Sequence, residues 1–504
     1  VVVANAFRWV EGSCALIVKS RLYPSECVVC KLSSPLVIGV KYNGDFQKEI
    51  PVYRLPQFLP LQYGGEKKLC YFNINQYPAI PIPSEVFISS DAQSFSKETT
   101  QLIYLCEYDV VSFSPEGFRI FSLIEDTPDV RVIQDIEPYH LEYPLKRPDD
   151  VTYSEIFQQL DVVSTMINKY IDFEHNKVII PGLDQYLDRI RGSRRLLFIA
   201  SGTSYNAVLS VRSLLEEAFP QNIQIEFSSE YNEQHCKVTP EDVCIFVSQS
   251  GETGDTTYAI HRVKHFHPLT IAITNTRGSS ITQLVDFIIY TTAGSERGIA
   301  ATKTYSANIM ALIFFAAAIS EKQCVSFSAL KEFPAQVTKA LELESDVQTI
   351  NKQIAEQSSI LACGRGANYA VAREAALKLK ILGYLSAESF HEGELKHGPL
   401  SLVEEAMKII FLATVSSGGK IEDYRSTLGQ IAARGAYPIV ITDQEHAADV
   451  EFYAGVLIIV PKVEDYLQPI INIIPLQLLA YYVAKAKGID PDKSRNLSKC
   501  ATIQ

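Results

Sequence analysis

Continuous apolar runs recur through the second part of the chain, and the gaps between them leave room for a helix. Runs that are continuous rather than alternating indicate parallel strands covered on both faces. They are found at residues 196–200, 243–247, 270–274 and 287–290, and again at 359–363, 408–412, 438–441 and 456–460. The first run of each set leads into a glycine turn and a helix. The pattern therefore predicts an internal duplication, with two tandem doubly wound parallel-sheet α/β domains.

The first part of the chain has a different pattern. Up to about residue 122, short β-type runs alternate with turns, which predicts a mostly β domain. The polar, proline-bearing stretch 42–83 is expected to be a long surface loop. Residues 137–184 are helical in pattern and charged, with prolines suited to a linker. The chain is therefore divided into a partial β-rich domain (1–136), a helical linker (137–190), a first α/β domain (191–345) and a second α/β domain with a C-terminal tail (346–504).

Charge and composition limit the classes of partner. The 504-residue chain has a net charge of −12, which argues against nucleic acid or an anionic membrane as a general partner. The most apolar stretch, residues 309–319, is shorter than the ~20 residues that span a bilayer and predicts a buried helix. Only Cys27 and Cys30 have paired spacing, and one such pair without histidines is weak evidence for zinc. We expect a cytoplasmic protein with reduced cysteines, no metal and no cofactor.

The segment from Ser248 to Thr256 reads Ser-Gln-Ser-Gly-Glu-Thr-Gly-Asp-Thr and directly follows an apolar run. Short hydroxyl donors and free backbone N–H groups at a helix N-terminus make an anion site suited to a phosphate. The segment lacks the glycine triplet of a dinucleotide site and the Gly-Lys of a Walker loop, so the expected ligand is a small phosphorylated metabolite. An ordinary helix cap is the alternative.

Three further segments carry the same kind of signal: residues 202–206, 393–399 (Gly-Glu-Leu-Lys-His-Gly-Pro) and 495–499 (Arg-Asn-Leu-Ser-Lys). From about residue 194 to residue 504, the chain resembles the isomerase half of the glutamine–fructose-6-phosphate amidotransferases, which is built from two sugar isomerase (SIS) domains. Residues 11–16, 34–39 and 89–92 look like the later half of the family's glutaminase domain. The resemblance implies an aminotransferase module that forms glucosamine 6-phosphate from fructose 6-phosphate.

The resemblance also assigns residues. Lys499 matches the lysine that condenses with the ketose C2 carbonyl, a reaction that burial of the amine favours. His397 matches the ring-opening acid/base, on a loop that in the family reaches the neighbouring subunit, which implies a homodimer or homotetramer. The residues expected to hold the sugar phosphate are Thr203, Ser204, Ser248, Gln249, Ser250, Thr253 and Glu388.

Two departures from the family matter. Lys378 matches an active-site lysine, but Ile381 stands where the family has the glutamate that moves a proton between C1 and C2. Isoleucine cannot accept a proton, so isomerisation is expected to be slow unless Glu374, seven residues earlier on the same helical face, substitutes. No cysteine is N-terminal and the first half of the glutaminase domain is not matched. Release of ammonia from glutamine is therefore not expected from this chain.

Two other functions stay open on the sequence alone. One is a catalytically compromised paralogue that binds the sugar phosphate or regulates an active subunit. The other is a SIS-type transcriptional regulator, which the lack of a basic helix-turn-helix segment disfavours.

Overall fold

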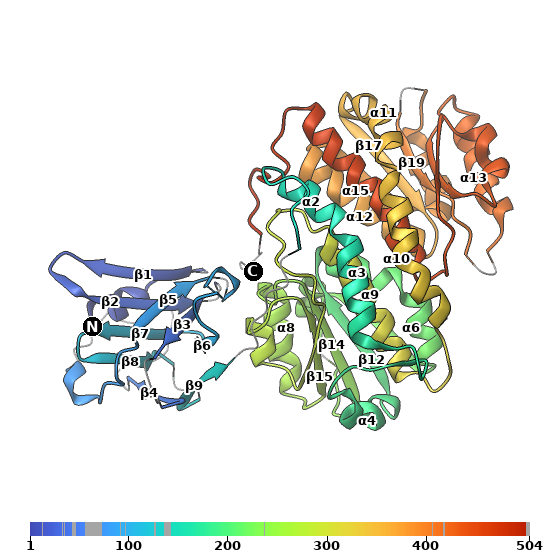
Figure 1. Ribbon diagram of the computed structural model, residues 1–504. Helices are drawn as coiled ribbons and strands as arrows, with labels where there is room; N and C mark the ends of the chain where they lie inside the picture. Colours follow the sequence, from blue (N-terminus) through green and yellow to red (C-terminus); the bar gives the residue numbers. More distant parts are fainter. Residues whose placement is uncertain are drawn as a thin grey trace.

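The fold is given by a computed structural model, which describes the chain except residues 13, 33, 35, 43–46, 56–72, 91, 96, 125–127, 136–142, 236, 406, 417–418 and 500–504. Figure 1 shows a β-rich domain at the N-terminal end beside two α/β domains that stack on each other. Two sequence expectations fall partly or wholly outside the described residues: the start of the linker at residue 137, and half of the predicted loop at 42–83.

The N-terminal domain contains one nine-stranded sheet in the order β1-β2-β7-β8-β4-β9-β6-β3-β5. Its pairings are antiparallel except for β4 with β8, which is parallel. The elements are α1 Val2–Phe7, β1 Cys14–Ser20, β2 Tyr23–Leu32, β3 Val37–Lys41, β4 Glu49–Arg54, the 3₁₀ turn η1 Ile74–Gln76, β5 Glu85–Ser89, η2 Ala92–Phe95, β6 Gln101–Tyr104, β7 Asp109–Ser114, β8 Gly117–Ser122 and β9 Val130–Asp135.

Strand β4 corrects one expectation. Residues 49–54 were expected to belong to a surface loop, but they lie inside the sheet between β8 and β9. Ile50 and Val52 are buried while their neighbours are more exposed, which is the alternation of a half-buried strand. Pro51 made the segment look like a loop, although a proline is tolerated in a strand wherever its missing N–H is not needed by the ladder.

Residues 143–190 form a structured strap rather than a flexible linker. Its elements are α2 Val151–Phe157, α3 Gln159–Tyr170, β10 Ile171–Asp172, β11 Lys177–Val178, η3 Leu183–Tyr186 and α4 Leu187–Arg191. The backbone N–H groups of Val151 and Thr152, at the start of α2, donate to the carboxylate of Asp492 at 2.9 and 2.7 Å. A carboxylate at that position satisfies otherwise unpaired donors and suits the helix dipole. The strap is thereby fixed to the C-terminal tail.

The first α/β domain has a parallel sheet in the order β13-β12-β14-β15-β16. Its elements are β12 Arg195–Ala200, α5 Gly202–Ser210, α6 Arg212–Ala218, β13 Asn222–Phe227, α7 Ser228–Glu233, β14 Asp242–Ser248, α8 Gly254–Lys264, β15 Leu269–Thr274, η4 Ser280–Gln283, β16 Phe287–Tyr290, α9 Lys303–Ile319 and α10 Phe327–Glu342. Helix α8 faces the N-terminal domain, and α9 lies on the other side of the sheet (Figure 1).

The second α/β domain repeats this order, as β18-β17-β19-β20-β21, again all parallel. Its elements are α11 Glu344–Ala355, β17 Ser359–Gly364, α12 Ala367–Gly383, β18 Ser386–His391, η5 Glu392–His397, η6 Pro399–Leu402, β19 Ile409–Leu412, α13 Ile421–Ala432, β20 Ile439–Asp443, α14 Ala447–Val450, η7 Glu451–Tyr453, β21 Val456–Val460 and α15 Gln468–Ala486. The equal strand orders confirm the predicted duplication and the doubly wound fold.

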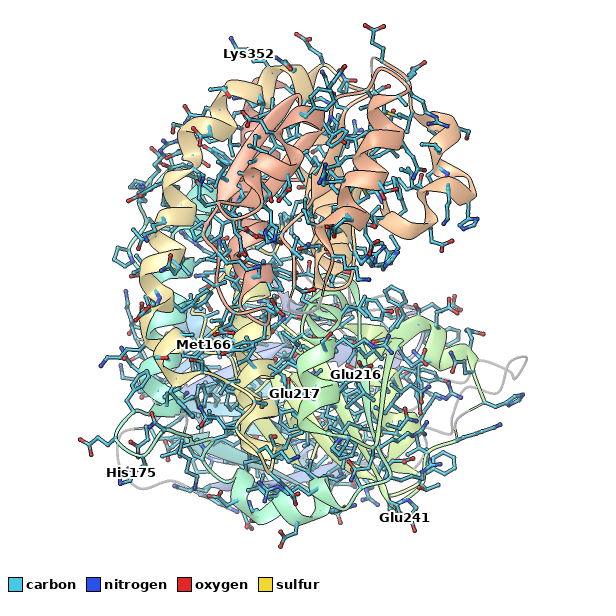
Figure 2. All side chains as sticks on the ribbon, turned by 90° about the vertical axis from the view of Figure 1, so that its right-hand side faces the viewer. Met166, His175, Glu216, Glu217, Glu241 and Lys352 are labelled. Carbon is cyan, nitrogen blue, oxygen red and sulfur yellow. The ribbon has the colours of Figure 1, made fainter. Side chains whose placement is uncertain are left out.

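Two apolar helices form the centre of the molecule. Every residue from Ile309 to Ala316 in α9 is buried, as the apolar stretch predicted. Helix α15 has the length and composition of a membrane span, but 83% of its apolar window is buried inside the protein, so it is a core helix here. One continuous core runs through both α/β domains and the strap. Charged residues such as His175, Glu241 and Lys352 lie at the periphery (Figure 2).

Candidate functional site

The serine-rich loop lies at the carboxyl end of β14, the edge at which doubly wound sheets bind ligands. Ser248 ends the strand and Thr253 is the residue before α8, and their hydroxyl oxygens are 3.2 Å apart. Ser248 also accepts a hydrogen bond from the Gly251 N–H at 3.1 Å. Thr253 makes no side-chain cap to α8. The helix dipole and its first N–H groups are therefore directed at this loop, as in an anion site.

The loop is held rigidly against the segment that follows β15. Gly251 has a φ of +66°, and a Cβ there would lie 1.9 Å from the Ser279 hydroxyl oxygen. The Gly251 carbonyl accepts from the Ile281 N–H, and the Gln249 carbonyl accepts from the Asn275 N–H, both at 3.1 Å. Only glycine fits such a left-handed, crowded position. The hydroxyls of the loop are consequently presented in one fixed arrangement.

The Thr203 hydroxyl contacts two charged residues of the second α/β domain. It donates to Glu374 at 2.9 Å and accepts from the Lys378 ammonium at 3.0 Å, and Lys378 and Glu374 form an ion pair at 2.7 Å. The Glu374 carboxylate also accepts from the Asn206 amide at 2.8 Å. Lys378 and Glu374 belong to α12 of the second domain and are 1% and 0% exposed. Three predicted site residues thus meet across the boundary between the two α/β domains.

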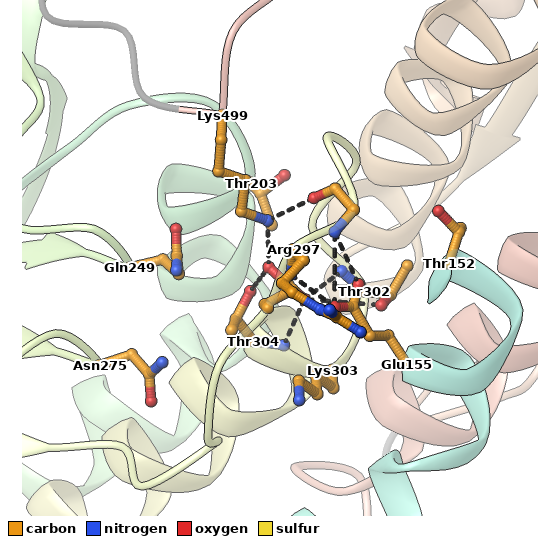
Figure 3. Close-up of polar contacts among 12 residues, drawn as sticks. Thr152, Glu155, Thr203, Gln249, Asn275, Arg297, Thr302, Lys303, Thr304 and Lys499 are labelled. Atoms are coloured by element: carbon orange, nitrogen blue, oxygen red, sulfur yellow. Dashed lines mark hydrogen bonds and ion pairs between the residues drawn. The ribbon is translucent and has the colours of Figure 1, made fainter. Parts of the chain in front are cut away.

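Lys499 reaches the first α/β domain from the C-terminal tail. Its ammonium donates to the Glu296 carboxylate at 2.8 Å and to the Gly298 carbonyl at 2.6 Å. Figure 3 shows the lysine pointing from the tail into this polar cluster. The lysine side chain is 23% exposed. The amine must give up a proton and these two bonds before it can attack a carbonyl.

Asn275 connects the serine-rich loop to the lysine. Besides its bond to Gln249, its side-chain amide donates to the Gly294 carbonyl at 2.7 Å and accepts from the Ala293 N–H at 2.8 Å. Glu296 follows two residues later. These hydrogen bonds therefore join the loop to the chain segment that carries Glu296. Both parts follow strands of the first sheet at its carboxyl edge.

Glu296 is a fully buried carboxylate with several fixed donors. One of its oxygens accepts from the Thr302 and Thr304 N–H groups at 2.8 and 3.2 Å, and the other accepts from the Thr304 hydroxyl at 2.7 Å and from Lys499. Burial raises the pKa of Glu296, but the Lys499 ammonium and these hydrogen bonds outweigh it and lower the pKa to about 2. Glu296 is thus ionised while Lys499 is charged.

Two more buried ionisable groups surround this pair. Glu155 of the strap accepts from the Arg297 and Gly298 N–H groups at 2.5 and 3.2 Å. Burial, followed by the charge of Glu296, raises the pKa of Glu155 to about 7. Burial lowers the pKa of Lys303, whose ammonium donates to Gln158 at 2.8 Å. The strap therefore contributes buried polar contacts to the site through Glu155 and Gln158.

Three residues singled out by the sequence lie apart from this cluster. His397 is exposed at the end of η5, and Glu388 is exposed on the edge strand β18. Ile381 is partly buried and packs against the main core. The single chain does not bring His397 or Glu388 to the serine-rich loop, so each could act there only from another copy of the chain.

Sequence reasoning missed Glu296, Glu155 and Lys303. A signal for Glu296 was present, because the run Ala293-Gly294-Ser295-Glu296 is a polar glycine turn shortly after β16, the fifth strand of the sheet. Among the runs of the first set, such turns are predicted above only after the first and the second, at residues 196–200 and 243–247. Glu155 and Lys303 gave no signal, because their contacts join segments far apart in the chain.

A cavity of about 480 Å³ lies between the N-terminal domain and the first α/β domain. Its lining includes Lys31, Tyr104, Arg131 and Arg277, and none of the predicted site residues. The cavity reaches the serine-rich loop only at Glu252.

The model of the SIS domain family matches residues 189–318 and 353–486. The glutamine–fructose-6-phosphate aminotransferase (isomerizing) of Encephalitozoon cuniculi is 33% identical over 536 residues, covering 100% of this chain and 76% of the relative. The enzyme of that name from Saccharomyces cerevisiae is 34% identical over 545 residues, covering 98% and 76%. Among solved structures, the C-terminal domain of glucosamine-fructose-6-phosphate aminotransferase from Francisella tularensis has a TM-score of 0.65 at 29% identity, over 70% of this chain and 100% of that one. The Escherichia coli tagatose-6-phosphate ketose/aldose isomerase, at 17% identity and a TM-score of 0.57, shares the fold alone.

Proposed function

Because the chain belongs to the glutamine–fructose-6-phosphate aminotransferase (isomerizing) family, we propose that its two SIS domains convert fructose 6-phosphate to glucosamine 6-phosphate. Identity of about a third across three quarters of these relatives favours the enzyme over a regulatory paralogue. The observation that carries the proposal is the Lys499 amine, which the tail brings to the same sheet edge as the serine-rich loop.

The sugar phosphate binds at the start of α8, where the hydroxyls of Ser248, Ser250 and Thr253 surround free N–H groups. Hydroxyl and amide donors beside a helix dipole hold a dianion without a permanent cation, so the product can still leave. Lys499 loses a proton to solvent and attacks C2 of the open-chain ketose, and the carbonyl oxygen leaves as water. Ammonia then displaces the lysine from C2, so the nitrogen of the released amino sugar comes from ammonia. The lysine is thereby the covalent anchor of the substrate.

Ring opening requires an acid/base that this chain does not itself bring to the loop. We assign that role to His397 of a second copy, because its exposed position at the end of η5 leaves the imidazole accessible to another subunit. The functional unit is therefore a homodimer or homotetramer. A charged sugar phosphate does not cross membranes, so we place the enzyme in the cytoplasm with its substrate.

Borohydride trapping tests the assignment of Lys499. Fructose 6-phosphate plus borohydride should add one reduced sugar phosphate to Lys499, located by peptide mass spectrometry. The variant Lys499→Arg keeps the positive charge but cannot form the imine, so it should give no adduct. Adduct formation at another lysine, or none in the unmodified chain, would overturn the assignment. Thermal shift by glucosamine 6-phosphate would then report whether the chain binds phosphosugars without forming the imine.

A further inference from the structure

Turning a 2-ketose into a 2-amino aldose moves a hydrogen from C1 to C2, and this step needs a base close to both carbons. Two carboxylates of the site are candidates for that base, Glu296 and Glu374. Ile381 cannot serve, since its side chain is apolar and packs against the core. The inference that follows rests on the proposed function, because it presupposes the imine on Lys499.

Glu374 is poorly placed for this step. Its two oxygens are already bonded to the Lys378 ammonium at 2.7 Å, the Thr203 hydroxyl at 2.9 Å and the Asn206 amide at 2.8 Å. These contacts hold the Glu374 carboxylate against Lys378, and none of them is with Lys499. Its contacts join the two α/β domains and account for its complete burial without a catalytic role.

Glu296 differs from Glu374 in its contact with Lys499. One of its oxygens is fixed by the Thr302 and Thr304 N–H groups, and the other accepts from the Thr304 hydroxyl at 2.7 Å and faces the Lys499 nitrogen at 2.8 Å. In an imine C2 is bonded to that nitrogen, so C1 lies only about 2.5 Å from it by ordinary covalent geometry. A carboxylate oxygen touching the nitrogen therefore needs little movement to reach a C1 hydrogen at near-attack distance. No other carboxylate among the described residues contacts Lys499.

The charge of Lys499 links imine formation on the lysine to the basicity of Glu296. While the lysine is an ammonium, its charge lowers the pKa of Glu296 and makes the carboxylate a weak base. A neutral imine removes that charge, whereas burial, which raises the pKa of Glu296, persists. The other ionisable groups next to the pair are Glu155, Lys303 and Arg297. Glu296 becomes a stronger base at the stage at which a base is needed.

We propose that Glu296 is the general base that carries the proton from C1 to C2 of the substrate imine. After ammonia has replaced the Lys499 nitrogen on C2, Glu296 takes the C1 proton of the resulting imine. The C–H electron pair forms the C1–C2 double bond, and the C=N π pair passes to nitrogen, which is protonated. The C1 hydroxyl then loses its proton as the C1 carbonyl forms, and C2 takes the proton back from the Glu296 carboxylic acid. The glutamate ends as it began, and the absence of a carboxylate at Ile381 does not stop isomerisation.

The test separates imine formation from proton transfer. Exchange of the C1 hydrogens of fructose 6-phosphate is followed by NMR in D₂O, and the imine is followed by borohydride trapping. Glu296→Gln should lower the exchange rate by about 10²–10⁴-fold, the usual contribution of a positioned base, while trapping on Lys499 persists. Asp242→Asn is the matched control, because Asp242 is also a fully buried carboxylate paired with an arginine, at the opposite edge of the same sheet. The Asp242→Asn variant should exchange the C1 hydrogens of fructose 6-phosphate at the rate of the unmodified chain.

Several results would overturn the inference. Normal exchange in Glu296→Gln would do so, as would loss of exchange in Glu374→Gln with Glu296→Gln unaffected. Loss of trapping together with exchange in Glu296→Gln would mean that Glu296 only positions the lysine. If Glu296→Gln does not fold, Glu296→Asp replaces it, with exchange expected to slow because the carboxylate is withdrawn by one methylene. No trapping in the unmodified chain would instead refute the proposed function, and this inference with it.

Discussion

Removing the Lys378 ammonium from the domain boundary should destabilise the protein strongly. Lys378→Met leaves the Glu374 carboxylate 0% exposed and without its cation at 2.7 Å, although the Thr203 and Asn206 donors remain. Breaking a buried ion pair by removing one partner costs about 3–5 kcal/mol, and the two remaining donors put this case near the lower end, at about 3 kcal/mol.

A double variant distinguishes the cost of an unpaired buried carboxylate at Glu374 from the cost of lost side-chain packing at Lys378. Lys378→Met with Glu374→Gln removes both charges, and the glutamine oxygen can still accept from Asn206, so the loss should shrink to about 1 kcal/mol. Arg212→Met is the matched control: Arg212 and Glu216 have the same i,i+4 spacing and 2.7 Å distance, but are 56% and 47% exposed. That change should cost no more than about 0.5 kcal/mol.

Urea unfolding followed by circular dichroism measures all three variants. The expected order of stability is the Arg212 variant, then the double variant, then Lys378→Met alone. A Lys378→Met variant as stable as the Arg212 variant would refute the reasoning, and so would a double variant no more stable than the single one.

Three further predictions concern the site. Ser248→Ala with Thr253→Ala should weaken binding of glucosamine 6-phosphate by roughly 2–4 kcal/mol, measured by calorimetry, because two hydrogen bonds to a charged phosphate are lost; unchanged affinity would place the phosphate elsewhere. Gly251→Ala should weaken the same binding, since its Cβ would meet the Ser279 hydroxyl at 1.9 Å at a φ of +66°, and a fully active variant would contradict the rigid loop. Burial and the neighbouring Glu296 raise the pKa of Glu155 from 4.5 to about 7. Between these two pH values the folded state holds a proton that the unfolded chain releases. The contribution of Glu155 to the free energy of unfolding should therefore decrease as the pH rises from about 4.5 to about 7. Glu155→Gln should flatten that fall in thermal melts, and an unchanged slope would mean that Glu155 does not titrate there.

Periodicity alone identified most of the α/β fold. The central strands are continuous apolar runs because both faces are covered, and their ends coincide with the predicted glycine and serine turns. The edge strands β13 and β18 were missed, because an edge strand such as Asn-Ile-Gln-Ile-Glu-Phe needs apolar residues only at alternate positions. Strand β4 was missed because its proline marked it as a loop.

The candidate site was less predictable than the fold. The serine-rich loop is local in sequence, so its residues could be named from the chain alone. The partners of Lys499 and Thr203 could not, because Glu296 and Glu374 lie 203 and 171 positions away along the chain. Contacts across that separation depend on how the tail and the second domain pack.

Formation of glucosamine 6-phosphate tests the central claim most directly. The chain is incubated with fructose 6-phosphate and ammonium, and the product is quantified by mass spectrometry, with Lys499→Arg in parallel. The account predicts glucosamine 6-phosphate from the unmodified chain and none above background from Lys499→Arg. Equal product from both would contradict the role of Lys499, and no product from a folded chain that binds fructose 6-phosphate would contradict the proposed reaction.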